Sequence, residues 1–172
     1  MTTQHRADRS PTPFTDLDAY VALPRVSGLL LSPAGDRLVT SVSTLDPERA
    51  SYVSALWEVD PSGRRPARRL TRSAKGESPA AFLPDGDLLF TSSRPDPQAK
   101  AEDEPPAALW LLPAGGGEAR VVAVRAGGVQ GARVARDDGR VVLTAQVFRL
   151  SYPLGACHFE EINRVIRSTK TE

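Results

Sequence analysis

The sequence has little of what would cross-link the chain, bind a metal or cross a membrane. Its 172 residues include one cysteine and two histidines, so no intramolecular disulfide and no cysteine-rich metal framework can form. No run approaches the roughly 18 apolar residues that a membrane-spanning helix needs. The first residues also lack the apolar region of a secretory signal peptide. We therefore expect a soluble, cytoplasmic protein with no membrane partner, no cofactor and no metal.

The sequence also lacks an excess of charge of one sign. Lysine and arginine total 22 against 21 aspartates and glutamates, and the formal net charge is +1. Nucleic-acid-binding proteins concentrate basic residues on one face or segment, whereas the arginines here are interleaved with Asp, Glu and Pro. This pattern is typical of solvated faces and turns, so we do not expect a nucleic-acid partner.

What the sequence does contain is a turn motif that recurs three times. Its glycines, Gly35, Gly86 and Gly139, lie 51 and then 53 residues apart. The first two copies combine Pro with Gly, which favours a tight turn because Pro presets φ and Gly tolerates a positive φ. We predict a hairpin at each copy. The copies read Ser32-Pro33-Ala34-Gly35-Asp36, Leu83-Pro84-Asp85-Gly86-Asp87 and Arg136-Asp137-Asp138-Gly139-Arg140.

Short apolar segments flank each turn and predict strands. A segment at 29–31, 80–82 or 132–134 precedes each turn, and one rich in β-branched residues follows it at 38–42, 88–92 or 141–145. A threonine stands five residues after each turn glycine, which predicts a register common to all three units. Two repeats continue with a third strand around a tryptophan, at 55–59 and 108–112, and a fourth at 67–71 and 119–123.

Four strands in a period near fifty are the sequence signature of a β-propeller blade. We therefore predict an all-β fold: an incomplete β-propeller over residues 14–146, with two four-stranded blades at about 28–71 and 78–124 and the start of a third at 129–146. An ordinary β-sandwich with coincidental turns is the alternative. Trp57 and Trp110 recur at matching positions, so we expect both to be core anchors between blades.

Three segments fall outside the repeat. Residues 1–13 are polar and are expected to be disordered, and a short N-terminal helix is predicted after them, capped by Thr15 and ended by Pro24. The acidic, proline-rich stretch from Arg94 to Pro106 predicts a long solvated loop.

Residues 147–172 form an atypical tail in which the repeat stops. Isoleucine, asparagine and cysteine occur only here, at Cys157, Ile162, Asn163 and Ile166, which favours a frameshift or truncation that joined unrelated sequence to the blade. The alternative is a C-terminal helix with Phe159 and both isoleucines on one face. Cys157 and His158 are adjacent, but two ligands cannot complete a tetrahedral metal site.

Several of these segments together resemble a known family. Asp16-Leu17-Asp18-Ala19-Tyr20, Leu23-Pro24-Arg25-Val26-Ser27 and the first turn are similar to the start of prolyl oligopeptidase-family serine peptidases of the acylaminoacyl-peptidase type. The similarity continues to about Ala145 through repeats of the TolB-like propeller kind. The resemblance implies that in full-length relatives the propeller is followed by an α/β-hydrolase domain that hydrolyses peptides.

The catalytic elements of such a hydrolase domain are not found in this sequence. Its nucleophile elbow reads Gly-x-Ser-x-Gly, and the nearest approach, Gly76-Glu77-Ser78-Pro79-Ala80, lacks the last glycine. Pro79 also has no N–H to donate to an oxyanion, so Ser78 is not expected to be a nucleophile. His5 and His158 lie in the two terminal segments. We assign no catalytic, cofactor-binding or metal-binding residue.

Two functions remain open from the sequence. The first is a non-catalytic propeller part of a serine peptidase, whose partners would be a peptide substrate or the catalytic hydrolase domain. The second is a stand-alone TolB-like module for protein interaction. In either case a propeller that does not close leaves open blade edges, so we expect self-association.

Overall fold

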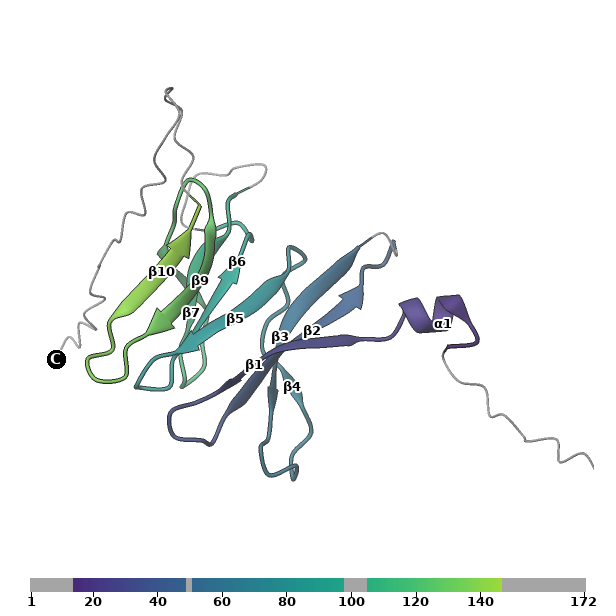
Figure 1. Cartoon of the computed structure of the whole chain (residues 1–172), viewed down its shortest axis with the longest axis horizontal. Coiled ribbons are helices and arrows are strands. Elements are labelled where there is room, and N and C mark those ends of the chain that lie inside the picture. The colour runs from purple at the N-terminus through teal and green to yellow at the C-terminus, as the bar shows by residue number, and fades with distance from the viewer. Residues whose placement is uncertain (1–13, 49–50, 98–104, 147–172) are drawn as a thin grey trace, which may run out of the picture.

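We describe a computed structural model of the protein, for residues 14–48, 51–97 and 105–146. These residues form one short helix and ten strands in three antiparallel sheets, which lie side by side in chain order (Figure 1). Nothing closes the row of sheets into a ring among the described residues. The all-β, incomplete propeller predicted from the repeat is therefore confirmed.

Each sheet is one blade with its strands in sequence order. Blade 1 contains β1 (Arg25–Leu31), β2 (Leu38–Leu45), β3 (Tyr52–Val59) and β4 (Arg68–Arg69). Blade 2 contains β5 (Glu77–Phe82), β6 (Leu88–Ser92), β7 (Ala108–Leu112) and β8 (Arg120–Ala123). Blade 3 is the hairpin of β9 (Val129–Val134) and β10 (Val141–Ala145). The domain boundaries predicted at residues 13 and 147 stay a prediction.

The three recurring turns are the hairpins between the first two strands of each blade, as predicted. Their glycines have positive φ angles, 74° at Gly35, 89° at Gly86 and 67° at Gly139, a region that residues with a Cβ rarely enter. In blade 2 the Gly86 amide donates to the Leu83 carbonyl at 3.0 Å, which closes the turn. The turn chemistry thus fixes the position of the first hairpin in each blade.

The register predicted from the threonines is wrong for blade 1. Thr40 lies opposite Trp57, whereas Thr91 lies opposite Leu109, one position before Trp110, the equivalent of Trp57. The reason is that the first hairpin contains one more residue between its paired strands than the second. Its first paired residue after the turn is Leu38, which makes Arg37 the extra residue.

The core lies between the blades rather than inside any one sheet. One buried cluster joins blade 1 to blade 2, and a second joins blade 2 to blade 3. Both faces of blade 2 are covered, which explains why β6 and β7 read as nearly continuous apolar runs. A strand with only one face covered would alternate instead.

The N-terminal helix α1 (Leu17–Val21) begins one residue later than predicted and has a different cap. Asp16, not Thr15, is the N-cap, because its Oδ1 accepts hydrogen bonds from the amides of Asp18 and Ala19. The helix stands at the outer end of blade 1 (Figure 1), buries none of its residues and ends at Val21, with Ala22 as its C-cap, before Pro24. The predicted disorder of 1–13 and helix within 147–172 lie outside the described residues.

Candidate interaction surface

Two faces of a blade must be distinguished to describe how blades meet. We call the side toward the preceding blade the front face and the side toward the following blade the back face. Blade 1 contributes its back face to the first buried cluster, and blade 2 contributes its front face. The back face of blade 1 consists of Leu30, Val39, Leu56 and Leu70, and the front face of blade 2 includes Phe82, Leu88, Phe90, Ala108 and Trp110.

The contact between blades 2 and 3 repeats the same pairing of faces. Leu89, Leu109 and Leu111 lie on the back face of blade 2, and Val129 and Val141 lie on the front face of blade 3. Leu89 occupies the place that Val39 has in blade 1, because each is the second paired residue after its turn. The molecule therefore contains one kind of blade contact twice.

The front face of blade 1 has no covering blade among the described residues. Leu31 is 57% exposed, although Phe82, its counterpart beside the turn of blade 2, is 8% exposed under blade 1. Leu29 on the same strand face is 67% exposed. The front-face position that is buried in blade 2 is thus exposed to solvent in blade 1, at the start of the row.

The back face of blade 3 likewise has no covering blade among the described residues. Val142 is the third member of the series that begins with Val39 and Leu89, since it is the second paired residue after its turn. Val39 and Leu89 are fully buried, and Val142 is 42% exposed. The two ends of the row therefore present the two complementary halves of the repeated blade contact.

The two tryptophans show the difference between a covered and an uncovered front face. Trp110 is 1% exposed, stacks against Phe90 with ring centroids 6.4 Å apart, and donates its Nε1–H to the Ser92 carbonyl at 3.2 Å. Trp57 lies on the front face of blade 1 and is only half-buried. The prediction that both anchor blade contacts is therefore correct for Trp110 and wrong for Trp57 within the described residues.

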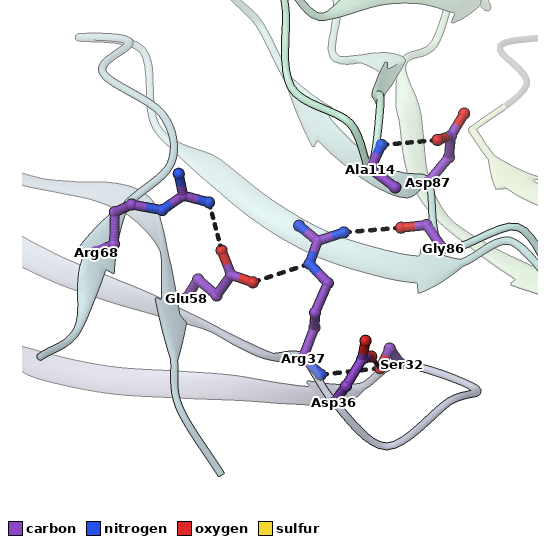
Figure 2. Close-up of polar contacts among 8 residues, drawn as sticks. All are labelled: Ser32, Asp36, Arg37, Glu58, Arg68, Gly86, Asp87 and Ala114. Atoms are coloured by element: carbon purple, nitrogen blue, oxygen red, sulfur yellow. Dashed lines mark hydrogen bonds and ion pairs between the residues drawn. The ribbon is translucent and has the colours of Figure 1, made fainter. Parts of the chain in front are cut away.

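A polar contact accompanies the apolar one where blade 1 meets blade 2. Arg37 pairs with Glu58 through Nε and Oε1 at 2.9 Å, and its Nη1 donates to the Gly86 carbonyl at 2.8 Å (Figure 2). Arg68 holds the other carboxylate oxygen of Glu58 at 2.7 Å. The extra residue of the first hairpin thus reaches across to the turn of the next blade.

The charges around Glu58 also affect its protonation. Burial raises its pKa, but hydrogen bonds and charges from Arg68 and Arg37 outweigh burial and leave the pKa below its usual value. Because the ionised carboxylate is favoured, this contact is present at neutral pH.

A second buried charge lies at the start of β5. The Glu77 side chain is fully buried on the front face of blade 2, and its nearest ion-pair partner is Arg94, with Nη1 and Oε1 3.6 Å apart. Burial raises the pKa of the Glu77 carboxyl, while Thr71, Arg94, Ser73 and Arg69 act in the opposite direction. Arg94 in turn lies over the Trp110 ring, 3.9 Å from its centroid.

Sequence reasoning missed this pair. Arg94 was predicted to begin a solvated loop, but its guanidinium packs on Trp110 and Phe90 and its side chain is 24% exposed. The sequence gives Glu77 no role beyond its place before Ser78. The signal available in the sequence was the repeat itself, because the equivalent positions, Val26 and Val129, are apolar in the other blades.

The residues weighed for catalysis are not brought together by the described part of the chain. Ser78 is exposed as the second residue of β5, and both histidines lie outside the described residues. No group of three or more metal-ligating side chains occurs in the part of the chain that the structure describes. An open hollow of about 520 Å³ lies beside the turns at 35–36 and 60–65 of blade 1. Its lining includes Asp60, whose pKa is lowered to about 2 by hydrogen bonds from Ser62.

The helices of the described residues include none that is long and apolar enough to cross a membrane. The described residues present an uncovered apolar face at each end of the row of blades. These faces are the candidate functional site.

No family model and no curated protein sequence matches this chain. Solved structures do. The structure of a putative TolB from Agrobacterium tumefaciens is 20% identical with a TM-score of 0.51, over 72% of this chain and 39% of that one. An AtxE2 isopeptidase variant with Astexin3-dC4 bound is 18% identical with a TM-score of 0.54, over 77% of this chain and 23% of that one.

At these identities the likeness shows the fold alone. The chain spans well under half the length of either structure, and the matching part holds two full blades and a hairpin. The described residues therefore have the fold of a TolB-like β-propeller, of which they form an incomplete row of blades.

Proposed function

We propose that this chain is a non-catalytic propeller segment of the kind found in prolyl oligopeptidase-family serine peptidases, and that its task is to present blade faces to other protein surfaces. The observation that carries the proposal is the repeated blade contact, whose two halves stand uncovered at the ends of the row. In a full-length relative the propeller would restrict access to peptide substrates and contact the catalytic domain.

Two further observations support the peptidase side of the proposal. The sequence segments at 16–20 and 23–27 resemble the start of that family, and one of the similar structures is an isopeptidase. Ser78 is followed by Pro79 within β5, and a nucleophile elbow needs a sharp strand-to-helix turn rather than a continuous strand. The chemistry would therefore belong to another domain.

A stand-alone TolB-like interaction module is the second candidate function. The other similar structure is a putative TolB, which favours a module without a hydrolase domain. In this case the uncovered faces would serve a protein partner directly, and no peptidase activity would be associated with the gene.

A fluorophosphonate probe, which labels activated serines, tests the non-catalytic assignment. We expect no labelling of the purified chain and no difference between the wild type and Ser78→Ala. Labelling that the substitution abolishes would show a serine nucleophile in this chain and would overturn the assignment.

Sequencing of the DNA downstream of the gene separates the two candidate functions. A reading frame that encodes Gly-x-Ser-x-Gly followed by Asp and His supports the peptidase family. A downstream region without such a frame supports the interaction module instead.

A further inference from the structure

We propose that this chain pairs with a second copy of itself, head to tail, so that the back face of blade 3 in each copy covers the front face of blade 1 in the other. The inference needs only the blade contacts described above. It goes beyond the proposed function because it names the occupant of the uncovered faces.

The geometry of the contact is already present twice within one chain. In both cases a back face packs on a front face, and the residues come from the same positions of the repeat. A third contact of this kind, between copies, needs no new arrangement of strands. It needs only the two halves that the row leaves uncovered.

The residues at the two ends fit their counterparts in the internal contact. On the front face, Leu31 stands where Phe82 stands in blade 2. On the back face, Val142 stands where Val39 stands in blade 1. Because Val39 and Phe82 belong to one buried cluster, we expect Val142 and Leu31 to meet in a cluster between copies.

The polar part of the internal contact also has counterparts at the two ends of the row. Arg37 immediately precedes the first paired residue of β2 and reaches the Gly86 carbonyl. Arg140 has the same place before β10; its Nε pairs with Asp138 Oδ2 at 2.9 Å, and its side chain is 63% exposed. The position equivalent to Gly86 is Gly35. Arg140 of one copy is thus placed to donate to the Gly35 carbonyl of the other.

Closure favours two copies over a longer chain of them. Contacts between unlike faces close into a ring or continue into a fibre. Each copy supplies two four-stranded blades and a two-stranded hairpin that starts a third, so two copies supply six blade positions, which lies within the roughly four to eight blades of closed propellers. Three copies would exceed that range. In the ring of two, each copy makes the same contact twice.

Substitution of one face at a time tests the pairing. We expect the wild-type chain to sediment as a dimer at micromolar concentrations. Leu31→Glu removes the front half of both contacts and Val142→Glu removes the back half of both, so each variant alone should be monomeric. A mixture of the two variants should form a heterodimer, because one complementary pair of faces remains intact.

Controls separate loss of the contact from loss of the fold. Both substituted side chains are exposed, and circular dichroism should show unchanged strand content. Leu29→Glu, at a site that is 67% exposed, repeats the front-face test if Leu31→Glu fails to fold. Val124→Glu is the matched control, because Val124 is 51% exposed but lies beyond β8 of blade 2, away from both end faces. It should remain dimeric.

Three outcomes would overturn the pairing. These are a wild-type monomer at all concentrations, a dimeric Val142→Glu variant, or a mixture that stays monomeric; the second would indicate front-to-front contact. The outcome is independent of the proposed function. A dimer labelled by the serine probe refutes the non-catalytic assignment alone, and an unlabelled monomer refutes the pairing alone.

Discussion

Among single residues, Glu77 departs most from the repeat. Its equivalents in blades 1 and 3 are valines, yet it is fully buried under blade 1, and its nearest ion-pair partner is 3.6 Å away. No hydrogen-bond partner of good geometry reaches either carboxylate oxygen within the described residues. A buried carboxylate with so little compensation is costly when ionised, which accounts for its raised pKa.

Glu77→Gln tests the cost of this charge through pH. A carboxyl whose folded-state pKa is raised stabilises the fold most below its unfolded value, 4.5, and loses that contribution as pH rises through the folded value. We therefore expect the stability of the wild type relative to Glu77→Gln to increase as pH falls from 7 toward 4.5. Thermal unfolding of both proteins across that range measures the difference.

Glu58→Gln provides the control of opposite sign. The folded-state pKa of Glu58 is lowered, so its contribution is present above 4.5 and is lost as pH falls through the folded value. The wild type should lose stability relative to Glu58→Gln in that acidic range. Parallel pH profiles for the two variants would contradict the assignment.

Arg37 differs from Arg68 although both contact Glu58. The Arg37 side chain is 16% exposed and also holds the next blade, whereas the Arg68 side chain is 73% exposed. We expect Arg37→Ala to lower the free energy of unfolding by roughly 1–2 kcal/mol and Arg68→Ala by no more than about 0.5 kcal/mol. Urea unfolding measures both, and equal losses would show that the contact to Gly86 contributes nothing.

Among the elements, the first hairpin determines the strand register of blade 1. The extra residue, Arg37, displaces the strand that follows by one position, and a shift of one residue turns every side chain to the other face. The threonine pattern suggested a common register because Thr40, Thr91 and Thr144 keep the same distance from their glycines. Strand pairing shows that in blade 1 the sequence distance from the turn glycine does not give the pairing register.

The third strands of blades 1 and 2 provide a matched pair of positions. Trp110 is buried between blades and Trp57 lies on the uncovered front face. We expect Trp110→Ala to lower the free energy of unfolding by about 3–5 kcal/mol and Trp57→Ala by much less, when both are measured on dilute, dissociated protein. Equal losses would mean that a surface within the same copy covers Trp57. Denaturant titration followed by circular dichroism compares them.

At the scale of the whole molecule, the described residues form a row of blades in which each blade contacts its neighbours. Its stability is then the sum of the blades and of two blade contacts. The same architecture places exposed apolar residues at both ends, where they cannot be buried without another surface. Association through these ends would add a blade contact at each, which is why the oligomeric state and the stability of the fold should be linked.

The sequence by itself determined the blade, its four strands and the position of its first hairpin. These features depend on local chemistry, because Gly and Pro turns and β-branched runs act on neighbouring residues. Tertiary structure decided which tryptophan is buried, that Asp16 rather than Thr15 caps the helix, and that Arg94 packs on Trp110. It also brought Arg37 to Gly86 and placed Glu77 under blade 1. Those outcomes depend on which blade covers which face, and the faces are matched only when separate repeats meet in space.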